Sequence, residues 1–571
     1  MESEIKKLIK DALKNLDIET NSIVLEHPED LKNGDYSTNV ALAIAKGVER
    51  NPRELAEKIV EEIKRLNVDK NIEKVEVAGA GFINFHLSRK FFSQSVEEIL
   101  NQAADFGKNK ILEGQKIMVE YTQPNPFKPF HIGHLMSNAI GESISRIVEF
   151  SGAYTARANY QGDVGLHVAK AIYGLLQKEE LQGKAGTHNL QASNIGQAYI
   201  YGANTYENDE KAKKEIDELN KKIYDRTDNK INEIYAWGFD VTMEAFEDLY
   251  EMLGTKFDYY FLESAMADSG REIVNANMDK VFEKSDGAVV FKAEKYDLKL
   301  HTRVFITSTG LPTYETKELG LTEEKFKTEP EMNLSIVVTA SEQLDYMRVV
   351  AKAISIIHPE FENKMKHITH GMMRLATGKM GSRKGNAITG ESLINDSREA
   401  VFEKMKDREF GEVEREKIVS DVAVAAIKYS VLKQGTGGDI IYDFEKSISF
   451  EGDSGPYLQY SYTRANSVLE KAQKENIFPD FENVPAEIFE VEKMLYKFPE
   501  VVLRSVSEYE PHYIANYLIE VARAYNSFYG NNVIVNKEDK TSPYKVALTY
   551  AFSFVMKTGL HLLGIEAPKK M

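Results

Sequence analysis

The spacing of apolar residues changes twice along the chain, and each change marks a region with its own expected architecture. In residues 1–110, apolar positions recur first at helical spacing and later in short alternating runs, which predicts a small α+β domain. The expected elements are helices at 5–16, 39–48 and 52–66 and paired strands at 75–77 and 82–87. None of these segments carries a combination of side chains typical of a catalytic site.

Strands and helices alternate from residue 111 to about residue 395, and this order favours a parallel sheet with helices on both faces. The apolar runs 117–119 and 334–338 are typical of buried strands, and 166–177 has the spacing of a helix. Residues 178 to about 255 are polar and rich in Glu, Asp and Lys at helical spacing. We therefore expect a helical insertion in that stretch.

From about residue 396 to residue 571 the apolar spacing is helical, which predicts an all-α bundle. The expected helices are 420–432, 456–472, 498–507 and 512–531. Tyrosines concentrate in this region, and packing is the simplest account of most of them. Tyr460 and Arg464 stand one helical turn apart, and a tyrosine beside an arginine also suits stacking on unpaired nucleic-acid bases.

The composition is that of an ordinary globular protein, 42% hydrophobic and 28% charged. The 571 residues exceed what one hydrophobic core accommodates, so several domains are expected. No apolar run reaches the ~18 residues of a membrane span, and the charged amphipathic start is unlike a signal peptide. We therefore expect a cytoplasmic protein that does not interact with a membrane.

The chain has no cysteine, and none of its 12 histidines shows a spacing typical of a metal site. Disulfides, thiolate chemistry and cysteine-bound zinc are thereby excluded, and no metal-binding residue is assigned. The net charge of −17 argues against non-specific coating of nucleic acid, which depends on Lys and Arg. It leaves open a local basic face for one specific RNA.

The stretch His131-Ile-Gly-His134 carries a strong chemical signal. It places two imidazoles three residues apart at the start of an expected helix, after a buried strand and a proline-bearing loop. A helix N-terminus in that position offers N–H groups to an anion, and the histidines would add donors for a transferring phosphate. The alternative is that both histidines are solvated or packing residues.

A second stretch, 378–386, is rich in glycine and lysine. Lys379, Arg383 and Lys384 are three cations within six residues on a glycine-bearing loop, which favours a polyphosphate ligand. The stretch does not fit the P-loop pattern G-x-x-x-x-G-K-[ST]. Taken alone, it is equally typical of an ordinary basic surface loop.

With their flanking residues, these two stretches resemble the two signatures of class I aminoacyl-tRNA synthetases, and the chain resembles the arginyl-tRNA synthetases in particular. The matching stretches are 119–125 (VEYTQPN), 128–134 (KPFHIGH), 159–163 (NYQGD), 310–317 (GLPTYETK), 382–386 (SRKGN), 455–460 (GPYLQY) and 563–568 (LGIEAP). Residues 34–36 with Asn39, and residues 81–84, resemble the additional N-terminal domain of that family. The resemblance covers nearly the whole chain.

The resemblance implies an enzyme that binds ATP and L-arginine, forms arginyl-adenylate with release of pyrophosphate, and transfers the arginyl group to the 3′ end of arginine tRNA. Mg²⁺ would accompany ATP, no protein-bound zinc is expected, and a monomer is expected. Three domains are implied: an additional tRNA-binding α+β domain at 1–110, a Rossmann-like catalytic domain at 111–395 that contains the insertion at about 178–255, and a helical anticodon-binding domain at 396–571.

The same resemblance implies roles for individual residues. Those expected to bind ATP are His131, Gly133, His134, Lys379 and Lys384, and the histidines and lysines among them are expected to be catalytic. Those expected to bind arginine are Glu120, Asn125, His131, Tyr314, Glu318 and Gln343. Those expected to contact the tRNA are Asn39, Tyr460, Arg464 and Met571. Carboxylates and an aromatic wall suit a planar guanidinium.

Three departures from the family pattern bear on the site, and one of them is that Asp345-Tyr346 follows Gln343 where many relatives have a histidine. Glu318 stands where the family usually has aspartate, so its carboxylate extends one methylene further. Gly381 and Ser382 replace the Ser and Lys of the second signature, and we expect Lys384, two residues on, to supply the missing charge.

Three alternatives stay open at this point: a synthetase for another amino acid, a tRNA-binding paralogue without catalysis, and a small nucleotidylyltransferase. The absence of cysteine counts against the zinc-bearing synthetases, and the acidic pocket favours a cationic substrate. The presence of His131, His134 and Lys379 argues against a loss of catalysis. A nucleotidylyltransferase would have no use for the tyrosine-rich helical region.

Overall fold

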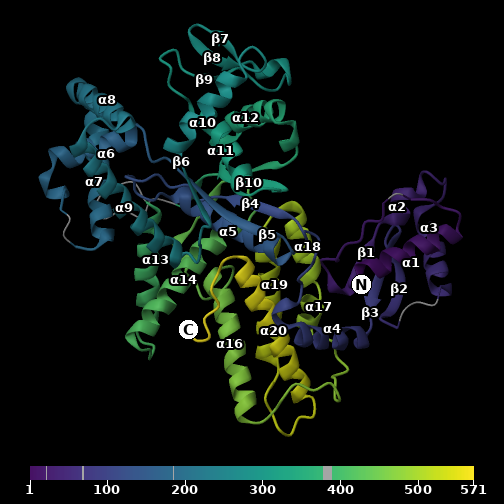
Figure 1. Cartoon of the computed structure of the whole chain (residues 1–571). Helices are drawn as coiled ribbons and strands as arrows, with labels where there is room; N and C mark the ends of the chain where they lie inside the picture. The colour runs from purple at the N-terminus through teal and green to yellow at the C-terminus, as the bar shows by residue number, and fades with distance from the viewer. Residues whose placement is uncertain (21, 67–69, 184–185, 377–388) are drawn as a thin grey trace. The chain divides into compact units, whose positions relative to one another are not determined.

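The computed structural model describes residues 1–20, 22–66, 70–183, 186–376 and 389–571, which divide into two compact units (Figure 1). The first unit consists of Met1–Phe106, Arg464–Phe498 and Glu520–Met556. The second consists of Gly107–Thr463, Pro499–Ile519 and Lys557–Met571. Among these described residues, no helix is both long enough and apolar enough to cross a membrane.

The second unit is built on a five-stranded parallel sheet, which confirms the fold predicted for this region. Its strands, in spatial order, are β11 (Met365–His370), β10 (Leu334–Ala340), β4 (Lys116–Glu120), β5 (Tyr154–Gln161) and β6 (Tyr259–Leu262). The chain adds β5 and β6 on one side of β4 and later adds β10 and β11 on the other side. Open α/β sheets bind ligands beyond the carboxyl ends of their strands at such a reversal.

Helices cover both faces of this sheet, because right-handed crossovers on the two sides of the reversal lie on opposite faces. Helices of the second unit that pack near this sheet include α5 (Ile132–Phe150), α10 (Glu263–Ala276), α11 (Tyr314–Thr328) and α12 (Leu344–Ile357). Met118 of β4, Met266 of α10 and Leu321 of α11 share one apolar core. Helix α5 packs against β4, β5 and β10, and its N-terminus follows the carboxyl end of β4.

Four helices between β5 and β6 share a separate apolar core. They are α6 (Leu166–Gln177), α7 (His188–Asn208), α8 (Glu210–Asp225) and α9 (Asn229–Met252). Ile172, Ile195 and Ile216 are buried in this core. The polar stretch therefore buries an apolar stripe and exposes its charged residues, as its helical spacing predicts.

A small antiparallel sheet interrupts the alternation of strands and helices, and the sequence analysis missed it. Its strands are β7 (Glu283–Ser285), β8 (Ala288–Phe291) and β9 (Arg303–Ile306). These strands are too short to show a clear apolar period. The available signal was Asp286-Gly287, a two-residue hairpin loop in which both residues have positive φ, 49° and 79°.

The remaining elements of the second unit come after β11 in the chain. They are β12 (Met373–Leu375), α13 (Gly390–Met405), α14 (Glu412–Leu432), β13 (Ile440–Tyr442) and α15 (Phe444–Ser447), together with α18 (Phe498–Glu508). β12 and β13 pair in parallel. Three long helices have residues in both units, and they are α16 (Gly455–Lys474), α19 (His512–Asn531) and α20 (Ser542–Leu562). The expected helices of the C-terminal region are all present.

The first unit contains a three-stranded antiparallel sheet in the order β1-β3-β2, packed against helices. The elements are α1 (Glu2–Asn15), β1 (Tyr36–Thr38), α2 (Val40–Ala45), α3 (Pro52–Arg65), β2 (Ile72–Ala78), β3 (Phe82–Leu87), α4 (Arg89–Gln102) and α17 (Glu490–Leu495). The predicted pairing of the strands at 75–77 and 82–87 is confirmed. Helix α4 was not predicted.

Candidate active site

A cavity in the second unit lies where all five parallel strands end. Its lining includes Glu120 at the end of β4, Ala340 at the end of β10 and His370 at the end of β11, and Gly162 and Glu263 follow β5 and β6. The predicted residues that line this cavity are Glu120, Asn125, His131, Gly133, His134, Tyr314, Glu318 and Gln343. The fold thus gathers every residue expected to bind arginine, and every described residue expected to bind ATP, at the reversal of strand order.

The two histidines close the first turn of α5. His131 is the N-cap residue, and its Nδ1 accepts a hydrogen bond from the Gly133 N–H at 3.1 Å. The Nδ1 of His134 accepts from the His131 N–H at 3.3 Å, and the two rings stack with centroids 3.5 Å apart. A neutral imidazole whose Nδ1 accepts carries its proton on Nε2. Each ring therefore has an Nε2–H donor available beside a helix N-terminus.

Burial and nearby positive charge keep both imidazoles neutral. Desolvation, together with Lys128, lowers the pKa of His131 to about 4. Desolvation, and then His131 and Lys128, hold the pKa of His134 well below its ordinary value. At neutral pH the pair therefore offers hydrogen-bond donors without a net charge. The positive end of the α5 dipole and Lys128 supply the attraction for an anion.

The opposite part of the cavity is acidic. The Glu120 carboxylate accepts a hydrogen bond from Gln123 Nε2 at 2.7 Å and forms a buried ion pair with Lys325. Glu318 lies on α11 and is 9% exposed. Burial, followed by repulsion from Glu120, raises the pKa of Glu318 to about 8. Two carboxyl groups close together at the end of a cavity form a site for a cationic side chain.

Polar and aromatic residues also line the cavity. Tyr314, the first residue of α11, is 67% exposed and lies at the wall of the cavity. Asn125 Oδ1 accepts a hydrogen bond from the Gly162 N–H at 3.1 Å. A Cβ atom on Gly162 would lie 2.7 Å from that oxygen, so the close approach requires glycine. Gln343 Oε1 accepts from the Tyr346 hydroxyl at 3.2 Å.

Several cavity residues were missed by the sequence analysis. Lys128 was part of a matching stretch but received no role, although it lines the cavity. Glu263, the first residue of α10, forms a 2.7 Å ion pair with Lys317 of α11. Lys325 and Tyr346 also belong to the surroundings of the acidic end. No local pattern distinguishes Glu263, Lys325 and Tyr346 from surface residues of a helix, so only the fold identifies them.

The predicted lysines of the second signature, Lys379 and Lys384, lie outside the described residues. The next described segment begins beside the histidines. Thr389 pairs with His131 through an isolated β-bridge, and the Gly390 N–H donates to the Phe130 carbonyl oxygen at 2.8 Å. Thr389 and Gly390, which come soon after the second signature in the sequence, are therefore held beside Phe130 and His131 of the first signature.

The residues predicted to contact tRNA lie away from this cavity in the sequence and are spread over both units. Asn39 is exposed at the N-cap position of α2. Arg464 donates a hydrogen bond to Asn526 and lies 5.0 Å from the centroid of the Tyr529 ring. Tyr460 and Met571 join one hydrophobic cluster, and Met571 is only 8% exposed. The Met571 side chain is thus largely buried in the described chain, and its contact with the tRNA stays a prediction.

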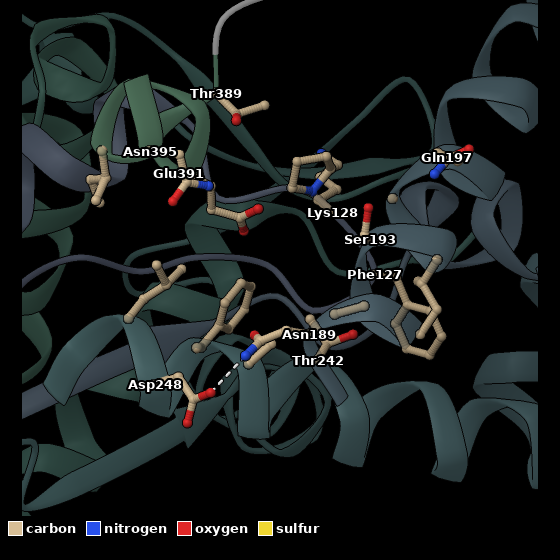
Figure 2. Close-up of a pocket in the computed structure, with 18 of the residues that line it drawn as sticks. Phe127, Lys128, Asn189, Ser193, Gln197, Thr242, Asp248, Thr389, Glu391 and Asn395 are labelled. Carbon is tan, nitrogen blue, oxygen red and sulfur yellow. Dashed lines mark hydrogen bonds between the residues drawn. The ribbon is translucent and has the colours of Figure 1, made fainter. Parts of the chain in front are cut away.

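A larger cavity, of about 550 Å³, lies next to the active-site cavity and is shown in Figure 2. Helices α7, α9 and α13 and the loop at 127–129 form its walls, and Lys128 lines both cavities. Its other polar residues are mostly neutral, such as Ser193, Gln197 and Thr242. None of the predicted site residues that the structure describes lines it. The smaller cavity is the candidate active site because it contains the predicted residues His131, His134 and Glu318, whose pKa values are strongly shifted by burial.

Comparison with known proteins agrees with this geometry. Residues 95–444 match the family described as "tRNA synthetases class I (R), catalytic domain", 458–571 match "DALR anticodon binding domain", and 3–87 match "Arginyl tRNA synthetase N terminal domain". The chain is 30% identical to an arginine--tRNA ligase of Clostridium perfringens and 29% identical to one of Borrelia hermsii, with all of each chain covered.

Solved structures show the same fold. The arginyl-tRNA synthetase of Thermus thermophilus aligns over 100% of both chains with a TM-score of 0.80 and 22% identity. The arginyl-tRNA synthetase of Plasmodium falciparum aligns over 100% of this chain and 99% of its own, with a TM-score of 0.77 and 20% identity.

Proposed function

The chain belongs to the family of arginyl-tRNA synthetases, and from this premise we propose that arginine and ATP react in the cavity at the carboxyl ends of β4 and β10. The enzyme joins arginine to its tRNA and uses ATP as a substrate. The observation that carries the proposal is the presence of an acidic end and a histidine end in one cavity. Each end has the chemistry of one substrate.

The acidic end holds the guanidinium group of arginine. Glu318 and Glu120 provide carboxylate oxygens, which accept the paired N–H groups of a planar guanidinium. Tyr314 forms an aromatic wall beside them, and its exposed position at the start of α11 leaves room for the substrate to enter. Asn125 and Gln343 orient the backbone end of the substrate through their amide groups.

The histidine end holds the phosphates of ATP. An oxygen of the arginine carboxylate attacks the α-phosphorus, a new P–O bond forms, and the bond to the leaving pyrophosphate breaks. The Nε2–H groups of His131 and His134 and the N-terminus of α5 stabilise negative charge on the phosphate oxygens. Gly133 has no side chain, so it leaves space between the two histidines at the first turn of α5. Lys379 and Lys384, which lie outside the described residues, are assigned to neutralise the leaving pyrophosphate, as the family resemblance implies.

Mg²⁺ bound to the phosphates would neutralise part of their charge. Among the described residues, no group of three or more potential ligands gathers to hold a metal ion. We therefore assign it to ATP and name no protein ligand.

The tRNA contacts lie on the N-terminal and helical parts of the chain. Asn39 is an exposed polar residue suited to a backbone or base contact, and Tyr460 and Arg464 lie one turn apart on α16. The matched family description for 458–571 names an anticodon-binding domain, which supports a base-stacking role for these two residues. Met571 contributes by packing beside Tyr460. We further propose that the enzyme is a cytoplasmic monomer, as the family resemblance implies.

The test is arginine-dependent exchange between ATP and radiolabelled pyrophosphate, measured with and without arginine tRNA. Exchange that requires arginine and is not supported by lysine or glutamine is the expected result. A requirement for tRNA in this assay would agree with the family resemblance. Exchange that follows another amino acid, or tRNA binding without any exchange, would contradict the proposal.

A further inference from the structure

Helix α11 carries three residues of the arginine end in a single row. Tyr314, Glu318 and Lys325 are separated by four and seven positions, and at 100° per residue they lie within about 40° of one another around the helix. Exposure falls along this row, from 67% at Tyr314 to 9% at Glu318 and 3% at Lys325. The row therefore runs from the mouth of the cavity into the interior, and it ends in a cation.

Lys325 and Glu120 form an ion pair that is almost completely buried. Their side chains are 3% and 1% exposed. The second oxygen of Glu120 accepts the hydrogen bond from Gln123. A buried ammonium is costly unless it is paired, and removing one partner leaves an uncompensated charge. The negative charge of Glu120 is thus neutralised by a residue of the protein, Lys325, and not by the substrate.

Glu318 differs from Glu120 in this respect. In the part of the chain that the structure describes, no side chain forms a hydrogen bond or ion pair with the Glu318 carboxyl group. Glu318 lines both the active-site cavity and a small cavity of about 70 Å³ behind it. Lys325 lines only the small cavity. Lys325 therefore reaches Glu120 from behind and leaves the substrate side open.

We propose that Lys325 is the internal counter-ion of the arginine site, where it neutralises Glu120 so that the pocket presents one uncompensated carboxylate, Glu318, to one guanidinium. Two carboxylates and one ammonium leave a single negative charge when both acids are ionised, and the substrate cation completes neutrality. This inference rests on the proposed function of the cavity. Lys325 is a positioning residue, because its effect on the substrate passes through the two carboxylates.

The charged and titratable groups that face Glu318 from the surrounding elements are Glu120 of β4, Tyr160 of β5, Glu263 of α10, Glu315 and Lys325 of α11 and Tyr346 of α12. Lys366 and His367 of β11 also line the small cavity with Glu318. Lys325 is the cation whose charge lowers the pKa of Glu318. Without it, Glu120 and Glu318 would repel each other more strongly, and the pKa of Glu318 would rise further. Arginine would then have to displace a more tightly held proton, and binding would need a higher pH.

The experiment compares Lys325→Met with Lys327→Met, which makes the same change on α11 at a residue whose side chain is 62% exposed. The KM for arginine is measured in pyrophosphate exchange with saturating tRNA and ATP between pH 6 and pH 9. In wild type the KM for arginine falls as the pH rises. For Lys325→Met we expect this fall to occur about one pH unit higher, so that the KM for arginine at pH 7 is about tenfold larger than in wild type. The KM for ATP stays the same, and Lys325→Arg restores the wild-type profile.

A Lys325→Met profile that coincides with that of wild type, or a uniform rise in KM without displacement along the pH axis, would overturn the proposal. If Lys325→Met does not fold, Lys325→Gln takes its place. Glu318→Gln distinguishes a failure of the proposed arginine site from a failure of the counter-ion role of Lys325. An arginine KM unaffected by Glu318→Gln contradicts the proposed arginine site, whereas an effect of Glu318→Gln without an effect at Lys325 contradicts only the counter-ion.

Discussion

Replacing Glu318 by Gln tests the arginine site most directly, because the change removes one ionisable group and preserves the side-chain shape. Loss of one partner from a buried charge pair costs about 2 to 5 kcal/mol of binding free energy. In the wild type, part of this binding free energy is spent on removing a proton from Glu318, because Glu318, with a pKa of about 8, is largely protonated at pH 7 in the free protein. Removing that proton costs about 1.4 kcal/mol per pH unit below the pKa.

The net effect at pH 7 should therefore lie near the lower limit, about 2 kcal/mol, or about a 30-fold rise in the KM for arginine. The sign of the pH dependence follows from the raised pKa. Wild-type KM for arginine should fall as the pH rises from 6 towards 8, because Glu318 loses its proton, and then level off. Glu318→Gln has no proton to lose, so its KM should be flat over this window, and the difference between the two proteins should grow with pH.

The assay is pyrophosphate exchange at saturating tRNA, with separate KM values for arginine and ATP at each pH. Glu324→Gln is the matched control, because Glu324 lies on the same helix about 120° around from Glu318 and is half-buried. An arginine KM within twofold of wild type, or a Glu318→Gln profile that still falls between pH 6 and pH 8, would refute the reasoning. Glu318 would then be a structural residue of the cavity wall.

Three further predictions concern other parts of the enzyme. Because His131 and His134 are neutral, kcat for adenylate formation at saturating arginine should not change between pH 6 and 8, and a decline centred near pH 6.5 would show that an imidazole titrates there. Deleting residues 567–571 removes Met571 from its cluster with Tyr460 and should raise the KM for tRNA in aminoacylation by tens-fold, because a stacked base contributes about 1 to 3 kcal/mol. Pyrophosphate exchange at saturating tRNA should be preserved. A normal KM for tRNA would show that the tail only packs. Lys384→Ala should slow single-turnover adenylate formation about a hundredfold, on the order of 3 kcal/mol, and a wild-type rate would exclude a role at the triphosphate.

The elements of the fold could be predicted wherever one segment contains its own signal. Helix α6 occupies Leu166–Gln177 and α19 occupies His512–Asn531, the ranges expected from apolar spacing. Such helices bury one stripe of their own residues, so the spacing of apolar residues within the segment is enough to predict them. The strands β7, β8 and β9 were missed because three or four residues are too few to establish a period, and only the turn at 286–287 marks them.

The sequence by itself, through its motifs and their order, was sufficient to identify the family and its reaction and to name many of the residues that line the cavity. What it could not determine is the state of those residues. The neutrality of His131 and the raised pKa of Glu318 come from desolvation and from charges on other elements, summed over the whole cavity. The pairing of Lys325 with Glu120 joins positions 205 residues apart on a helix and a strand. Only the topology of the sheet and the rotation of α11 bring them together, and for that reason the internal cation of the arginine site is a property of the tertiary structure.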